Sequence, residues 1–287
     1  MPQGGGLVSD GLSALALAGA ELSGVELTGL AIMSLIVGIV GGIVGIALGV
    51  VRLPIMTAVG IDPLIAASTN LFVSVLGSIA GSWPAILQNR IVYRIVLVIG
   101  IPAIGGSFVG GLYADIISRT VLLTIVAMLL VWSSTMMIVR AIAELRNRLA
   151  SSEDGDPSTG RGDLNRKTVA RESFVGFGIG VIGGAVGLAL GVLRMPALIH
   201  VLKMKPSLAA GTNLALTILV GSSGFTGHLL RGRVDWMLVS AIGIPAMTGM
   251  FAGSRMGGNV DPAKLRLVVG IVLLVVSPLV FFDAFLG

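Results

Sequence analysis

The chain has 287 residues, of which 55% are hydrophobic and only 11% charged, and it contains 42 glycines and no cysteine. Because a water-soluble domain of this size normally carries about a quarter charged residues, this composition predicts an integral membrane protein. The lack of cysteine excludes a disulfide framework and a catalytic thiol, and with only two histidines a zinc site is not expected. We therefore expect no metal and no cofactor, and we attribute the net charge of +5 to membrane topology and not to nucleic-acid binding.

Charged residues are concentrated in one stretch of the chain. Thirteen of them lie between Arg140 and Glu172 and only 20 in the other 254 residues, so two apolar blocks flank a polar linker, residues 141–171. The composition of this linker is typical of a solvated loop. Residues 1–29 precede the first block and carry no basic residue before their apolar stretch, so we expect an extracytoplasmic or interfacial segment and not a secretory signal peptide.

The two apolar blocks are copies of one unit. Residues 38–52 read GIVGGIVGIALGVVR and residues 180–194 read GVIGGAVGLALGVLR, with ten identities in fifteen positions. After a one-residue insertion the match continues between residues 66–71 and 209–214, now 143 positions apart. We therefore predict two repeats, residues 30–140 and 172–287. A doubled helical bundle is typical of secondary transporters, which bind their substrate at the repeat interface.

Each copy contains four apolar stretches, and the first of the four differs from the others. Glycine recurs through its middle, followed by an arginine and a proline, which predicts a break in the helix near residues 45–54 and at the matching place in the second copy. Such a stretch either crosses the membrane or forms a re-entrant hairpin. The stretches are residues 30–60, 63–88, 95–113 and 118–140, then 173–202, 206–229, 235–254 and 266–286.

Counting basic residues on each side distinguishes these two topologies. With the linker on the cytoplasmic side, eight spans would place 11 basic residues inside and 6 outside, whereas two hairpins would place 14 inside and 3 outside. The hairpin topology leaves three spans per copy, so the copies would have opposite orientations. We therefore predict an all-α polytopic membrane protein with two inverted-topology repeats, each a re-entrant glycine-rich helical hairpin plus three transmembrane helices. The three outside residues would be Arg119, Arg231 and Arg233.

These features resemble the sulfite exporter TauE/SafE family. The resemblance rests on the glycine-rich stretches that end on Pro54 and Pro196, on the Thr-Asn-Leu of the following helices, and on the doubled unit around a hydrophilic linker. It covers nearly all of residues 30–286 and implies an inverted repeat whose opening hairpins dip into the bilayer. It also implies transport of small anions such as sulfite and organosulfonates. Where the family has three glycines before the proline, this chain has Ala-Leu-Gly in both copies.

Arg52 and Arg194 occupy matching positions in apolar surroundings. An intramembrane arginine is costly enough to indicate a function, and its guanidinium fork fits an oxyanion. Alternatively, each arginine lies near the hairpin mouth and reaches lipid headgroups or caps a helix. No Asp or Glu falls deep in an apolar stretch, which favours an anion over a sodium or metal cation as the ligand.

The hairpin tips supply the remaining candidate ligands. Two half-helices that meet there would aim backbone N–H groups inward, which suits an anion. The Thr-Asn pairs of the next helices can donate to an anion or satisfy carbonyls freed at the break. His200 and His228 have no matching histidines, and they either carry a proton or have no special role. The predicted substrate site comprises Gly45, Gly49, Arg52, Pro54, Thr69 and Asn70 with Gly187, Gly191, Arg194, Pro196, Thr212 and Asn213.

The sequence therefore predicts a secondary transporter that exports a small anion across the cytoplasmic membrane, with the substrate bound between the hairpin tips. The alternatives are a passive anion channel and a membrane assembly partner without transport. We expect no enzyme, because the glycine-rich runs lack the Gly-Lys-Ser/Thr of a phosphate loop. The expected partners are a small anion and the bilayer. Glycines four residues apart, at 106 and 110 and at 249 and 253, permit close helix contacts within one chain or across a homodimer.

Overall fold

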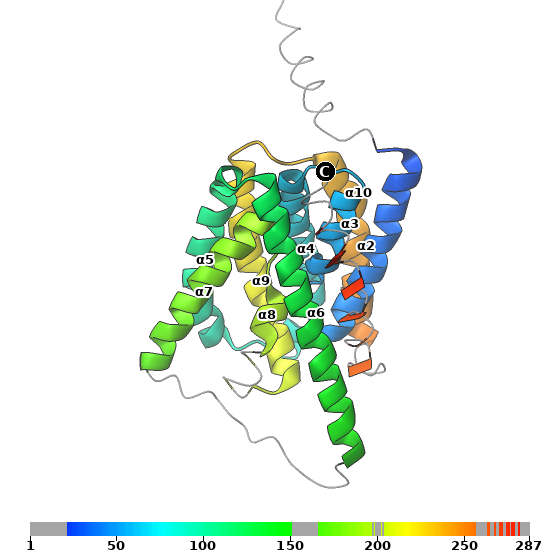
Figure 1. Ribbon diagram of the computed structural model, residues 1–287. Coiled ribbons are helices and arrows are strands. Elements are labelled where there is room, and N and C mark those ends of the chain that lie inside the picture. The colour runs from blue at the N-terminus through cyan, green and yellow to red at the C-terminus, as the bar shows by residue number, and fades with distance from the viewer. Residues whose placement is uncertain are drawn as a thin grey trace, which may run out of the picture.

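The computed structural model describes residues 22–150, 166–196 and 204–256, together with isolated positions between 198 and 281. Every regular element in this part of the chain is helical (Figure 1). Residues 1–21 and most of the linker and of the predicted last span, 266–286, lie outside the described residues. The predicted division into domains stays a prediction. The helices are α2 (Gly24–Val44), α3 (Gly49–Ala58), α4 (Pro63–Leu87), α5 (Tyr93–Leu112), η1 (Ala114–Ile116), α6 (Arg119–Ala150), α7 (Arg166–Val186), α8 (Gly191–Pro196), α9 (Pro206–Leu229) and α10 (Trp236–Met256).

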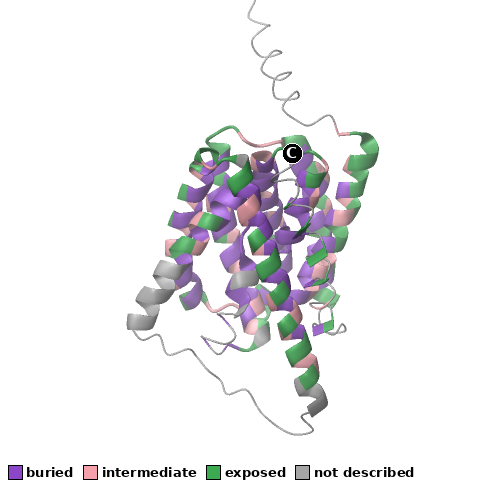
Figure 2. Ribbon diagram, in the orientation of Figure 1, coloured by how far each residue is buried: buried purple, intermediate pink, exposed green. Residues whose placement is uncertain are grey.

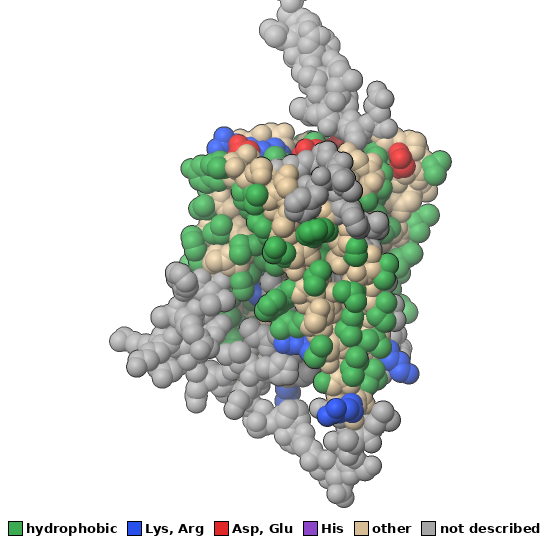
Figure 3. Space-filling model, viewed as in Figure 1, with side chains coloured by type: hydrophobic (Ala, Val, Ile, Leu, Met, Phe, Trp, Pro, Cys, Tyr) green, Lys and Arg blue, Asp and Glu red, His purple; other side chains and the backbone are tan. Residues whose placement is uncertain are grey.

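Within the described residues, six helices are long and apolar enough to cross a membrane. Five of them, in α4, α5, α6, α9 and α10, coincide with predicted spans, and the sixth is α2, which the sequence assigned to a hairpin. Hydrophobic side chains cover the flank of the bundle, and the charged ones in view lie toward its two ends (Figure 3). The polytopic all-α fold is confirmed.

Local signals explain where the first helices begin and end. A capping box starts α2, in which Ser23 Oγ accepts from the Glu26 N–H and the Glu26 carboxylate accepts from the Ser23 N–H. The helix ends at Gly45, which adopts a left-handed conformation with φ of 73°. Asp62 caps α4 by accepting hydrogen bonds from the N–H groups of Leu64 and Ile65, and proline occupies the first helical position.

The helices of the two copies pack against one another reciprocally. The first long helix of each copy lies along the third long helix of the other, so that α2 packs on α10 and α7 packs on α5. The second long helices, α4 and α9, pack together. The glycines four residues apart mediate these contacts within one chain. A Cβ at Gly110 would collide with Val181 of α7, and a Cβ at Gly253 would collide with Ile39 of α2. Buried residues lie on the helix faces toward the interior of the bundle (Figure 2), and α4 is more deeply buried than the other five candidate spans.

Candidate functional site

Both glycine-rich stretches break within the predicted region. The first breaks over residues 45–48, between α2 and α3, and the second over residues 187–190, between α7 and α8. Gly45 and Gly187 have φ of 73° and 77°, a conformation that is readily accessible only to glycine. A Cβ at Gly45 would collide with Ala210 of α9, and a Cβ at Gly187 would collide with Ala67 of α4. Each tip is therefore in contact with a helix of the other copy.

The prolines do not make these breaks. Pro54 lies inside α3, five residues after its first residue, and Pro196 is the last residue of α8. The turn comes earlier, at the left-handed glycine. Gly49 and Gly191 begin the short helices and face the asparagine of the next helix. A Cβ at Gly49 would lie 2.7 Å from Asn70 Nδ2, and one at Gly191 would lie 3.0 Å from the same atom of Asn213.

The two matched arginines are buried in protein. Arg52 is 3% exposed and Arg194 is 5% exposed. Arg194 donates to the carbonyl of Ala189 in the hairpin turn and, at 3.4 Å, to Thr217 Oγ1. Among the described residues, neither arginine has a carboxylate partner, and Nε and Nη1 of both have no hydrogen-bond partner. Buried donors of this kind are costly unless something accepts their hydrogen bonds.

The Thr-Asn pairs are fully buried, and part of their capacity satisfies backbone groups. Asn70 Nδ2 donates to the Gly187 carbonyl at 2.8 Å, which links α4 to the hairpin tip of the other copy. Thr212 Oγ1 accepts from the Val92 N–H at 3.0 Å. In the described part of the chain, Thr69 Oγ1, Asn70 Oδ1 and both amide atoms of Asn213 have no partner.

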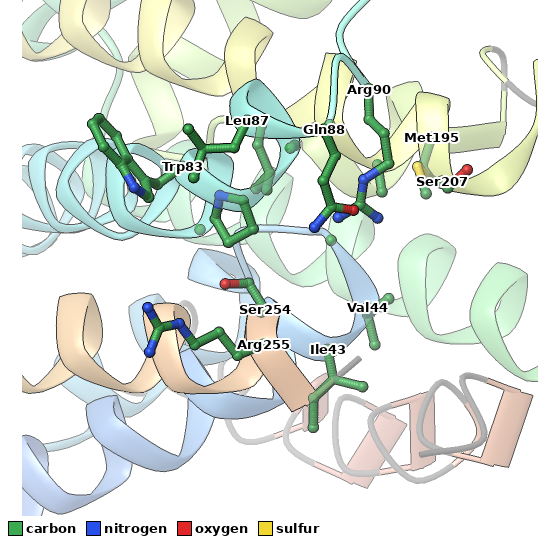
Figure 4. A pocket seen from close by; sticks show the side chains of 18 residues that line it. Ile43, Val44, Trp83, Leu87, Gln88, Arg90, Met195, Ser207, Ser254 and Arg255 are labelled. Carbon is green, nitrogen blue, oxygen red and sulfur yellow. The ribbon is translucent and has the colours of Figure 1, made fainter. Parts of the chain in front are cut away.

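A cavity of about 660 Å³ leads from one end of the bundle to the tip of the first hairpin. Its walls come from the ends of α2, α4 and α10 and from the start of α9. Of the residues of the predicted substrate site, Gly45 lines this cavity. Polar and basic side chains of its lining are labelled in Figure 4, namely Gln88, Arg90, Ser207, Ser254 and Arg255. No acidic residue is among the described residues that line this cavity.

At the matching end of the other copy, which we call the closed end, the equivalent positions are packed and paired. His228, which matches Ala85 of the cavity wall, is fully buried, and its Nε2 lies 2.9 Å from the Gly184 carbonyl oxygen. Arg233, which matches Arg90, forms an ion pair with Asp115 at 2.8 Å, and Arg231 lies 3.8 Å from the same carboxylate. This end carries the α9–α10 connection, opposite the α4–α5 connection (Figure 1).

Two further contacts hold the closed end together. The Ser68 hydroxyl donates to the Arg233 carbonyl, and Arg231 Nε donates to the Leu112 carbonyl at 3.1 Å. Burial raises the pKa of Asp115, but the hydrogen bond and charge of Arg233 and the charge of Arg231 lower it by more, so the pKa lies below its usual 3.8. The carboxylate is therefore ionised at neutral pH. His200 lies outside the described residues.

Comparison with known proteins decides the family. The sequence profile of the sulfite exporter TauE/SafE family matches residues 30–278. The chain belongs to this family. It is 22% identical over 261 residues to YunE of Bacillus subtilis (strain 168), covering 86% of this chain and 94% of that protein, and 24% identical over 260 residues to YjnA of the same organism, covering 85% and 95%. Both are described as probable membrane transporter proteins. No solved structure matches the chain significantly.

This TauE/SafE family protein is thus a multi-pass membrane transporter and not an enzyme. Sequence reasoning had counted Arg90 and Arg233 only as topological charges and had not considered Asp115. The signal that singles out the two arginines was present, because they lie 143 positions apart and therefore match between the copies. Their different surroundings, an open cavity for Arg90 and an ion pair for Arg233, required the structure.

Proposed function

We propose that this TauE/SafE family protein is a secondary transporter that exports a small sulfur oxyanion, sulfite or an organosulfonate, across the cytoplasmic membrane. The observation that carries the proposal is the contrast between the two ends. One end has a cavity that reaches a glycine hairpin tip and is lined by polar and basic side chains, and at the matching end the equivalent positions are packed and paired. A binding region open to one side at a time is the arrangement that alternating access requires.

The two copies are inverted repeats with re-entrant hairpins in this proposal. The reciprocal packing of α2 on α10 and of α7 on α5 supports a pseudo-two-fold relation. Figure 1 supports the inversion, since α2 and α7 begin at opposite ends of the bundle. The short helices α3 and α8 are the returning arms of the hairpins, and the linker lies in the cytoplasm with the open end.

The substrate binds between the two hairpin tips. The predicted ligands are the glycine backbones, Arg52, Arg194 and the Thr-Asn pairs. In support, both arginines and Asn213 are buried with polar atoms that have no hydrogen-bond partner among the described residues, and an oxyanion with several acceptor oxygens would accept from their donors. Asn70 has a structural role as well, because it already donates to the opposite tip.

Reconstitution into lipid vesicles tests this function. Vesicles with the wild type should take up labelled sulfite or ethanesulfonate saturably, and the same anion on the opposite side should accelerate the flux. Arg52→Ala and Arg194→Ala should abolish most of it, whereas Arg94→Ala, at an exposed arginine, should not. Saturable flux that survives both substitutions would move the site elsewhere. Linear flux without acceleration from the opposite side would favour a channel, and no flux above empty vesicles would contradict transport of these anions.

A further inference from the structure

The loops that carry Arg90 and Arg233 are equivalent in position and in backbone. Each arginine follows a residue with positive φ, Asn89 at 53° and Gly232 at 68°. The backbone carbonyl of each arginine also lies against the other copy, at positions that match between the two copies. Ser68 donates to the Arg233 carbonyl, and a Cβ at Gly211, the residue that matches Ser68, would lie 2.5 Å from the Arg90 carbonyl oxygen. The two guanidinium groups are thus held by equivalent scaffolds.

Their electrostatic surroundings are not equivalent. Arg233 has the Asp115 carboxylate at 2.8 Å. Arg90 forms no ion pair with any described residue, and its buried Nε has no hydrogen-bond partner there. In sequence, the residue that matches Asp115 is Gly258, which has no side chain to pair with an arginine. Within the described residues, Arg90 therefore has no counterpart of the Asp115 carboxylate that pairs with Arg233.

The side chains around Arg90 complete an oxyanion site. In Figure 4 the polar ends of Gln88 and Arg90 lie next to each other in the cavity. Ser254 and Arg255 line the cavity from α10, where the Ser254 hydroxyl donates to the Phe251 carbonyl at 2.9 Å and the Arg255 guanidinium lies over the Phe251 ring. A guanidinium and an amide together offer several donors to one small anion. Apolar residues of the same cavity, Val44 and Leu214, can contact a short carbon chain. A volume of about 660 Å³ is ample for such a ligand and its water.

We propose that Arg90 and Gln88 form an outer anion site, which binds the sulfite or sulfonate group of the substrate before it reaches the hairpin tips. The bound anion takes the position relative to Arg90 that the Asp115 carboxylate takes relative to Arg233. This inference rests on the proposed function and adds a second binding position to it. Because the outer site acts on capture, its loss raises the KM for transport more than it lowers the maximal rate.

Anion-dependent thermal stabilisation and flux, measured with sulfite and with ethanesulfonate, test the outer site. Arg90→Gln should raise the anion concentration for half-maximal stabilisation, and the KM, by about tenfold, because a charge-assisted hydrogen bond is lost. Arg90→Lys should recover part of this loss. The matched control is Arg94→Gln, which removes the same charge from an exposed position four residues later. A larger loss for ethanesulfonate than for sulfite would identify the organosulfonate as the ligand, and the reverse would identify sulfite.

The outcomes separate the two proposals. If the wild type binds and transports these anions and Arg90→Gln has the same half-saturation, the outer site is wrong and the proposed function stands. If Arg94→Gln weakens binding as much as Arg90→Gln, the effect is one of total charge and the outer site is again wrong. If the wild type shows neither stabilisation nor flux, the proposed function itself fails, and the outer site fails with it.

Discussion

The two ends of this transporter are built from equivalent positions of the two copies, yet one end has a cavity and the other is packed and paired. At the open end, Ala85 lines a cavity and Arg90 has no carboxylate partner among the described residues. At the closed end, His228 fills the matching position with a hydrogen bond to Gly184, and Asp115 pairs with Arg233. The backbone framework is shared, so a small number of side chains accounts for the difference.

The closing contacts are of modest strength. Asp115 has 38% of its side-chain surface exposed, Arg231 has 40% and Arg233 has 12%, and ion pairs with such a partly exposed carboxylate contribute little to stability. A ligand can shift a conformational equilibrium only by its differential affinity for the two states, so both states must lie within a few kcal/mol of each other. A lightly held closed end fits this requirement better than a deeply buried ion pair would.

The prediction with the largest expected effect is that the two matched loops lie on opposite sides of the membrane. An externally added reagent should then label one loop and leave the other unlabelled. The chain has no cysteine, so Asn89→Cys and Gly232→Cys each introduce a single thiol in the matched loops. A membrane-impermeant maleimide added to intact cells should label the cysteine at position 232 and not that at 89. Permeabilised cells serve as the control and should label both. Labelling of both in intact cells, or of neither, would place the loops on the same side and contradict the inverted topology.

The next effect compares the two hairpin tips. Gly187→Ala should lower the free energy of unfolding by at least about 2 kcal/mol, because alanine disfavours the positive φ and would collide with the backbone of Ala67. Gly45→Ala should cost less, since the nearest atom there is the side chain of Ala210, at the wall of the open cavity. Thermal unfolding in detergent measures both. Gly29→Ala, in a helix with open space around it, is the control and should not destabilise.

Exchanging the side chains at the matching positions 85 and 228 tests whether the histidine accounts for the difference between the two ends. His228→Ala should destabilise by about 1–3 kcal/mol, since it removes a buried hydrogen bond to the Gly184 carbonyl. Ala85→His should place an imidazole in the wall of the open cavity and raise the KM for transport. Thermal unfolding and vesicle flux measure the two effects. If Ala85→His transports with the KM of the wild type, the cavity is not the route of the substrate.

The sequence alone predicted the helical fold, the repeat and the helix breaks, because hydropathy and glycine content are local properties. It left open whether Asn70 would donate to an anion or to a carbonyl freed at a hairpin, and the structure shows a hydrogen bond to the Gly187 carbonyl of the other copy. Whether Arg90 faces a cavity or an ion pair depends on how the copies pack together. Two repeats with the same pattern of glycine and hydrophobic residues give similar local predictions, whereas contacts such as that between Asp115 and Arg233 join residues that are distant in sequence.

The smallest expected effect is that of the exposed ion pair, and pH isolates it. The pKa of Asp115 lies below its usual 3.8, so the pair stabilises the closed end fully above that value and loses its effect as the pH falls through the lowered pKa. Asp115→Asn should therefore lower the unfolding temperature slightly and by a constant amount between about pH 5 and pH 8. The difference from the wild type should vanish below the lowered pKa. Asp62→Asn is the matched control, because Asp62 caps a helix near the same end and does not pair with an arginine in the described residues. A difference that grows as the pH falls would mean that Asp115 destabilises the closed end, and the comparison of the two ends would then rest on His228.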